Sequence, residues 1–195
     1  MSTSKTTYHH GDLSAALVRA AMELLEESGE TALSLRAVAR CAGVSPAAPY
    51  RHYADREALV SAVATVGYRE LAERLTAAHP SPSTPEELAR VAIAYVQFAL
   101  ERPALFRIMF GEPCEGDNDE REAATAAVSH YVRAIVERTF PQADAEALAT
   151  AIWALVHGLA FLHLDGKLDA SSPAVVADRV TAAIRALLTA TTGMT

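Results

Sequence analysis

Apolar residues recur at helical spacing along most of the chain, and no stretch alternates strictly between apolar and polar residues as a β-strand would. In the first such stretch Leu13, Leu17 and Leu24 share one face of a helix. Gly29 follows as a residue suited to ending a helix. The pattern predicts an α-helix that begins at Asp12 and ends near Gly29.

Two serines that can act as N-caps stand before two short helices. Ser34 precedes a helix predicted over 35–42, which stops at Gly43. Ser45 is the N-cap of a helix predicted over 45–53. Pro46 takes the first helical position, where a missing N–H costs nothing. Two short helices joined by a glycine turn indicate a helix-turn-helix unit.

Helices are also expected through the rest of the chain. Asp55 can cap a long helix to about His79, and PSPSTP (80–85) is a break. The sequence Thr84-Pro85-Glu86-Glu87 then predicts a capping box at the start of another helix. That helix is expected to end at Arg102. Further helices are expected over ALFRIMF after Pro103, over about 120–139, over 145–165 and over 173–191.

This pattern predicts an all-α protein of about nine helices in two parts. Residues 8–55 would form a three-helix helix-turn-helix domain, and residues 56–195 a C-terminal helical domain. The helix over 56–79 would connect the two domains.

Composition agrees with packed helices, since 51% of residues are hydrophobic and only 6% are aromatic. Cys41 and Cys114 form no CxxC motif, and no basic and apolar leader opens the chain. Both features favour a reduced protein in the cytoplasm. The longest apolar run (151–164) is too short for a membrane span, so a buried helix and no membrane contact are expected there.

The formal net charge of −7 at first argues against nucleic acid as a partner, but the charge is unevenly distributed. Residues 1–75 hold eight basic and nine acidic side chains, whereas residues 76–195 hold nine and fifteen. Within 36–56 there are four arginines and a single acidic residue, Asp55. A small cationic region therefore coincides with the predicted helix-turn-helix.

The residue types at 45–53 suit a helix that lies in the major groove of DNA. Small residues at its start allow close approach, and Tyr50 can contact a thymine methyl group or a phosphate. Arg51 can bind guanine or phosphate, while His52 and Arg56 can reach the DNA backbone. The candidate DNA contacts from these residues are Ser45, Pro46, Ala47, Ala48, Tyr50, Arg51, His52 and Arg56.

The stretch LSLRAVARCAGVSPAAPYRHYADREAL (33–59) resembles the N-terminal signature of the TetR family of transcriptional regulators. The similarity lies in the hydrophobic-Arg-x-hydrophobic-Ala start, the Ala-Gly-Val-Ser turn and the Asp-Arg-Glu-x-Leu opening of the next helix. YHHGDL (8–13) resembles the lead-in found in one branch of that family. RPALFRIMFG (102–111) and Trp153-x-x-x-His157-Gly158 resemble its WHG-type C-terminal domain.

The resemblance implies a regulator that binds a palindromic operator in double-stranded DNA as a homodimer, through helices 145–165 and 173–191. It implies repression that an unknown small-molecule effector relieves. By position, Arg36 would touch bases, and Ser45, Pro46, Ala47 and Tyr50 would face the groove. His52 and Arg56 match positions that contact phosphates.

One position departs from the family pattern. Pro49 stands directly before the tyrosine, where many relatives have leucine. If Ser45 is the N-cap, Pro49 removes the first hydrogen bond within the helix and disfavours α geometry at Ala48.

Aromatic and apolar side chains of the C-terminal part are candidates for the wall of an effector pocket. Trp153 and His157 lie one turn apart on a helix face, with Phe161 next along. Core packing, a pocket contact and a dimer contact all remain open for this pair. The candidates are Tyr95, Phe98, Phe106, Met109, Phe110, Tyr131, Trp153, His157 and Phe161.

No nucleophile elbow, glycine-rich phosphate loop, paired catalytic carboxylates or HxxxH motif occurs, so no enzyme, cofactor or metal site is expected. The main alternative to a regulator is a helical small-molecule-binding or scaffold protein that does not bind DNA. The acidic net charge and Pro49 support that alternative.

Overall fold

The computed structural model describes residues 10–111 and 119–192, which form α-helices, two short 3-10 helices and no β-strand. Residues 8 and 9 of the YHHGDL lead-in, and Cys114, lie outside these ranges. The all-α prediction is confirmed, with eight α-helices in the described residues where about nine were expected. The helices are α1 (His10–Ser28), η1 (Glu30–Ala32), α2 (Leu35–Cys41), η2 (Pro49–Arg51), α3 (Arg56–Ala78), α4 (Pro85–Glu101), α5 (Pro103–Phe110), α6 (Asp119–Thr139), α7 (Ala145–Leu164) and α8 (Pro173–Thr192).

The α-helix predicted over 45–53 is wrong, because this segment forms a turn followed by the 3-10 helix η2. The Ala48 N–H donates to the Ser45 carbonyl at 2.9 Å and the Arg51 N–H to the Ala48 carbonyl at 3.2 Å, which is the three-residue spacing of a 3-10 helix. Pro49 has no N–H for a four-residue bond to Ser45. Ala48 nevertheless keeps α-helical dihedral angles, so the displacement expected for it does not occur.

The N-caps predicted for the two neighbouring helices are confirmed. The Ser34 hydroxyl accepts a hydrogen bond from the Ala37 N–H at the start of α2. The Asp55 carboxylate accepts one from the Ala58 N–H, at 2.8 Å, at the start of α3. Gly43 ends the first of these helices with a φ of +67°, a conformation that costs glycine nothing.

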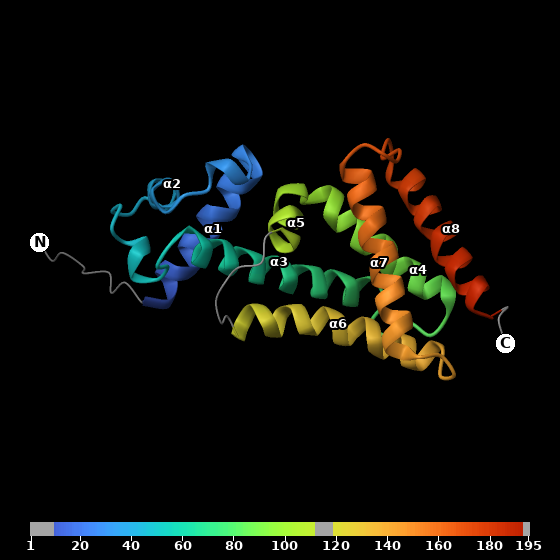
Figure 1. The fold of residues 1–195 in the computed structure, drawn as a ribbon. Helices are drawn as coiled ribbons and strands as arrows, with labels where there is room; N and C mark the ends of the chain where they lie inside the picture. The colour runs from blue at the N-terminus through green and yellow to red at the C-terminus, as the bar shows by residue number, and fades with distance from the viewer. Residues whose placement is uncertain (1–9, 112–118, 193–195) are drawn as a thin grey trace, which may run out of the picture.

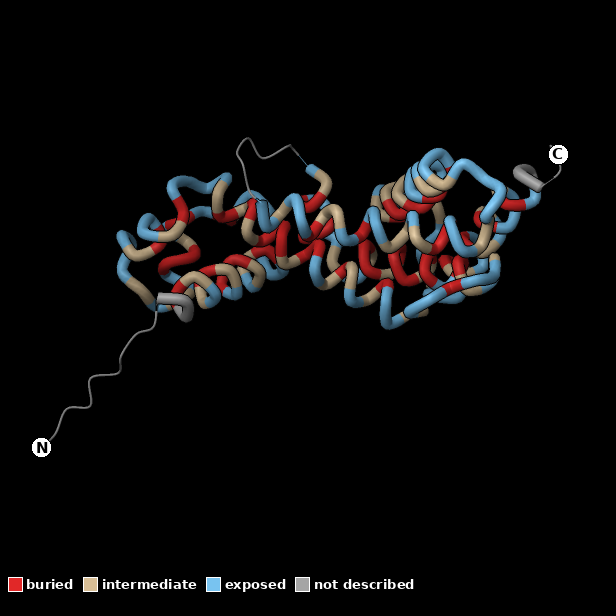
Figure 2. The backbone as a smooth tube through the Cα atoms, turned by 90° about the horizontal axis from the view of Figure 1, so that it is seen from below, coloured by how far each residue is buried: buried red, intermediate tan, exposed pale blue. Residues whose placement is uncertain are grey.

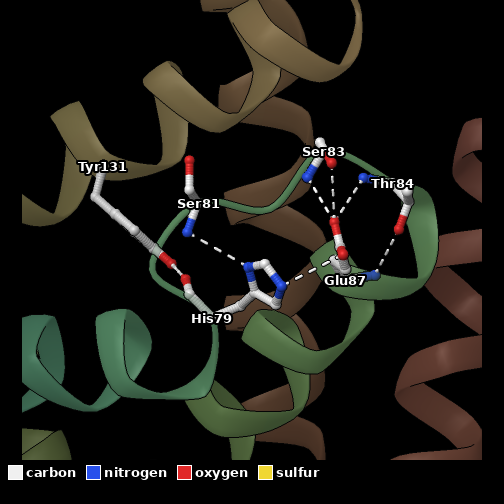
Figure 3. A network of polar contacts seen from close by, with 6 residues as sticks. All are labelled: His79, Ser81, Ser83, Thr84, Glu87 and Tyr131. Carbon is white, nitrogen blue, oxygen red and sulfur yellow. Dashed lines mark hydrogen bonds and ion pairs between the residues drawn. The ribbon is translucent and has the colours of Figure 1, made fainter.

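Polar contacts fix the turn between α3 and α4 (Figure 3). The Thr84 hydroxyl accepts from the Glu87 N–H while the Glu87 carboxylate accepts from the Thr84 N–H, which confirms the predicted capping box. The same carboxylate accepts from the Ser83 N–H at 2.8 Å, and these bonds lower the pKa of Glu87. From α6, the Tyr131 hydroxyl donates to the His79 carbonyl at the end of α3.

The helix α3 runs from the N-terminal helices to the middle of the molecule (Figure 1). At its N-terminal end it packs against α1, and its C-terminal half packs against α4 and α6. Further along, α4 packs against α7 and α8, which lie at the far end from α2. The division of the chain at residue 55 stays a prediction, because α3 takes part in the packing on both sides.

Buried residues form one continuous core along the length of the molecule (Figure 2). Helices α3 and α5 approach each other closely at Gly67. A Cβ added there would lie 2.6 Å from Met109 Sδ, so any larger residue would displace the Met109 side chain. Beside it the buried Tyr68 hydroxyl donates to the Met109 carbonyl at 2.7 Å, and the two contacts hold α5 against α3.

Among the described residues, α7 is the one helix long and apolar enough to span a membrane by length and composition alone. It packs against α4, α6 and α8. Trp153, which faces the groove beside α6, is 46% exposed, and Leu162 on the opposite side of the helix is 43% exposed. The prediction of a buried helix over 151–164 therefore holds for only one face of α7.

Replacing Thr84 with alanine removes the N-cap acceptor of α4 and is expected to lower the free energy of unfolding by about 1 kcal/mol. Urea unfolding at neutral pH measures the change. Ser81→Ala is the matched control, because Ser81 bonds through its backbone N–H rather than its hydroxyl. Wild-type stability in Thr84→Ala would contradict this account of the capping box.

Candidate nucleic-acid interface and helical pocket

Residues 45–51, which we call the DNA-contact turn, lie on the surface between α2 and α3. Ser45, Pro46, Ala47 and Arg51 are exposed, and Tyr50 is 53% exposed. The turn thus presents small side chains, one large aromatic ring and one guanidinium group to solvent. Such a surface can approach a DNA groove closely and contact base edges there.

Buried side chains on either side hold this turn in place. Pro49 is buried within it, and the buried Tyr53 follows it. The Tyr53 hydroxyl is hydrogen bonded to Ser14 Oγ on α1 at 2.9 Å. On the other side the Val44 N–H donates to the carbonyl of the buried Ala39 on α2. The position of the turn is therefore fixed by α1 and α2 together.

Three arginines near the turn have no acidic partner among the described residues. Arg36 and Arg40 are exposed on α2, and Arg51 is exposed at the end of η2. None of them takes part in an ion pair with any residue in 10–111 or 119–192. Guanidinium groups that are free in this way are available to phosphates or to guanine.

Arg56 lies in a different environment from these three. Its Nε donates to the Leu33 carbonyl at 3.0 Å, and one terminal nitrogen bonds the Glu30 carbonyl and carboxylate, each at 3.3 Å. The guanidinium group therefore joins the start of α3 to η1. The phosphate contact predicted for Arg56 stays a prediction, and it would compete with these bonds.

His52 also differs from its neighbours, because its ring is only partly exposed. Its Nε2 atom is buried and has no hydrogen-bond partner. The ring stands beside Tyr53, with centroids 6.4 Å apart. The phosphate contact predicted for His52 stays a prediction, and Nε2 could make it only in another ring orientation.

In the C-terminal part, six of the nine candidate pocket residues meet in one group, which we call the aromatic cluster. His157 lies at its centre, with its ring centroid 4.6 Å from that of Phe110 and 4.9 Å from that of Phe161. Its Nδ1 is hydrogen bonded to the Tyr95 hydroxyl at 2.9 Å. The six residues are Tyr95, Phe106, Phe110, Trp153, His157 and Phe161.

Burial keeps both members of the central hydrogen bond uncharged. It lowers the pKa of His157 and raises the pKa of Tyr95. A neutral imidazole and a neutral phenol can share one hydrogen bond in apolar surroundings without the cost of a buried charge. The pair is therefore a polar contact inside an otherwise apolar cluster.

The other three candidates lie elsewhere. Phe98 borders a surface groove between α3 and α4 that also contains Arg74 and Glu101. Tyr131 bonds to the backbone at the end of α3, and Met109 packs against Gly67. The structure thus separates these three from the aromatic cluster.

Beside the cluster, two hollows meet at Trp153. One is a cavity of about 30 Å³ among α3, α4, α6 and α7, which Tyr95 also lines. The other is an open groove of about 250 Å³ between α6 and α7. Val128, Val132 and Trp153 border both, so they form the partition between them.

The aliphatic walls of the cavity were missed in the sequence. Leu88, Val91, Ile152 and Val156 line it, and all are buried. A valine at helical spacing gives the same pattern whether it borders a cavity or packs in a filled core. No sequence signal distinguishes the two cases, since only the spacing between helices decides them.

Comparison with known proteins gives matches over most of the chain. Residues 17–63 match the family model described as "Bacterial regulatory proteins, tetR family". Residues 88–192 match the model described as "Tetracyclin repressor-like, C-terminal domain". The chain is 29% identical over 150 residues to the HTH-type transcriptional regulator BetI of Rhizobium meliloti (strain 1021), covering 74% of each protein.

Solved structures share the fold along nearly the whole chain. A protein of unknown function from Rhodococcus sp. RHA1 is 34% identical with a TM-score of 0.77, over 93% of this chain and 98% of that one. A bacterial regulatory protein in the TetR family from Rhodococcus RHA1 is 24% identical with a TM-score of 0.66, over 89% and 95%.

Arg56→Lys keeps the positive charge but removes the Nε donor to Leu33, and it is expected to lower the free energy of unfolding by about 1 kcal/mol. Thermal unfolding without DNA measures this effect. Arg36→Lys is the control, because Arg36 is exposed and has no ion-pair partner among the described residues. Equal stability of the two variants would show that the bonds of Arg56 do not stabilise the fold.

His157 gives a pH dependence of stability. Because its pKa is lowered in the folded state, the unfolded chain binds a proton at this position first. The free energy of unfolding should then fall as the pH decreases below about 6.5. Between about pH 7.5 and about pH 5.5 the urea midpoint should fall further for wild type than for His157→Gln. An equal fall of the urea midpoint in wild type and in His157→Gln would contradict a lowered pKa of His157 in the folded state.

Proposed function

Since the chain belongs to the TetR family of DNA-binding transcriptional regulators, we propose that it binds a two-fold symmetric operator as a homodimer and releases it when a small molecule binds. The observation that carries the proposal is the DNA-contact turn, with Tyr50 exposed and Arg36, Arg40 and Arg51 unpaired within the described residues. These groups give an acidic protein a local cationic surface. The alternative, a helical carrier that does not bind DNA, is set aside by the family match of residues 17–63.

The small size of the DNA-contact turn supports a dimer. A turn and a single 3-10 helix reach only a few base pairs, and two copies related by two-fold symmetry double the contact. The outer faces of α7 and α8 suit the contact between copies. Leu162 is exposed on α7, and exposed alanines on both helices allow close approach. We assign the predicted interface of helices 145–165 and 173–191 to these faces.

The hollows at Trp153 support a ligand site in the C-terminal part. The walls of the inner cavity are aliphatic and aromatic, with the Tyr95 hydroxyl as a polar group nearby. An apolar molecule could enlarge this cavity by displacing Trp153 toward the outer groove. The ligand would then favour a conformation in which the two DNA-contact turns no longer match the operator. Repression in the cytoplasm, relieved by ligand, is the mode that the family resemblance favours.

Selection from random duplexes tests the proposal, with wild type and Tyr50→Ala compared at near-physiological salt. Wild type is expected to enrich a two-fold symmetric motif, because two identical turns contact the DNA. Tyr50→Ala should lose that enrichment while keeping salt-dependent binding to any duplex, since the arginines remain. Enrichment of an asymmetric motif, or none by folded wild-type protein, would refute the proposal.

A further inference from the structure

Arg102 joins three helices through its two terminal nitrogens. It stands at the corner between α4 and α5, where one nitrogen lies 2.6 Å from the Glu26 carboxylate on α1. The other nitrogen lies 2.9 Å from the Glu70 carboxylate on α3. The side chains of Arg102 and Glu70 are 27% and 34% exposed and that of Glu26 is 53% exposed, so the pair with Glu70 is the more shielded from solvent.

Among the ion pairs between described residues, Arg102–Glu26 is the one that links α1 to the C-terminal helices. Arg56–Glu30 lies within the N-terminal part, at the start of α3. The remaining pairs connect helices from α3 onward or lie within one helix. Apolar contacts also join α1 to the C-terminal part, but among the described residues Arg102 forms the one ion pair between them.

The backbone holds Arg102 at a fixed place. The next residue is Pro103, which disfavours α geometry at Arg102, and the observed φ and ψ of −126° and 54° lie outside it. The Arg102 N–H donates to the Phe98 carbonyl and its own carbonyl accepts from the Phe106 N–H. The side chain therefore starts from a corner that α4 and α5 both determine.

The same two helices carry much of the aromatic cluster. Tyr95 lies on α4 two turns before Arg102, and Phe106 and Phe110 lie on α5 just after it. A change at the cluster that shifts α4 or α5 would move the corner between them. Through the pair with Glu26, that movement reaches α1, whose Ser14 is bonded to Tyr53 beside the DNA-contact turn.

We propose that Arg102 is a positioning residue that sets the angle between the N-terminal unit (residues 10–55) and the C-terminal part. In a dimer this angle fixes the distance between the two DNA-contact turns. Arg102 thereby determines the spacing of half-sites that the protein accepts, although it touches no DNA. The inference rests on the proposed function, because spacing has a meaning only for a dimer on a symmetric operator.

The experiment compares Arg102→Gln, Glu26→Gln and Arg74→Gln with wild type. Arg74 is the matched control, because it forms an ion pair with Glu101 between α3 and α4 and none with α1 among the described residues. The probes are the duplex selected above, the same duplex with one or two base pairs inserted between its half-sites, and a duplex with one half-site scrambled. Fluorescence anisotropy at fixed salt gives each affinity.

Arg102→Gln and Glu26→Gln are each expected to weaken binding to the selected duplex about ten-fold, because a freed N-terminal unit must be ordered on binding. Both should discriminate less than wild type against the duplexes with inserted base pairs. Binding to the scrambled duplex should not change, since each DNA-contact turn is intact. The double variant should be no weaker than either single one, because both remove the same contact.

Wild-type affinity and wild-type spacing preference in Glu26→Gln would overturn the inference. This variant alters one exposed carboxylate, so it decides the matter even if Arg102→Gln does not fold. The same loss in Arg74→Gln would also overturn it, by tracing the effect to general destabilisation. If wild type itself showed no preference for a symmetric duplex, the proposed function would be wrong. This outcome can be told apart from the two above, because they concern the variants and not the wild type.

Discussion

Helix α1 from the N-terminal part and helices α4, α5 and α6 from the C-terminal part all pack against a single helix, α3, and the rest of the structure depends on that constraint. Leu59 and Val63 are buried near its start, while Leu71 and Leu75 are buried near its end. Since the helix is continuously hydrogen bonded over 23 residues, neither end can shift without the other responding. The contacts with α5 at Gly67 make this helix part of the C-terminal core, while its N-terminal end packs against α1, one of the two helices that hold the DNA-contact turn.

The ends of helices were the features most predictable from sequence. Ser34, Asp55 and Thr84 each accept the hydrogen bond that their position suggested, because capping depends on a few adjacent residues. The family resemblance was predictable for the same reason, since its motifs are short and contiguous. The all-α class follows from periodicity, which needs no knowledge of how the helices pack.

What could not be predicted depends on contacts between distant residues. The sequence showed that Pro49 would weaken the helix over 45–53, but not that the segment would wind as a 3-10 helix around a buried proline. Arg56 looked like a free cation, whereas the structure joins it to Leu33, which precedes it by 23 residues. Nine aromatic and apolar side chains looked alike, and only helix packing separated Phe98 and Tyr131 from the cluster around His157.

These observations give a physical account of how an acidic protein can act on DNA. Three arginines without an ion-pair partner among the described residues and one exposed tyrosine lie in or beside the DNA-contact turn, whereas most acidic side chains belong to residues 76–195. Because the DNA-contact turn is short, we propose that a single chain binds DNA weakly and that two chains act together. The most direct test is the mass of the complex with its selected duplex, measured by sedimentation or native mass spectrometry. The account predicts two chains, or a multiple of two, on each duplex; a single chain bound with full affinity would contradict it.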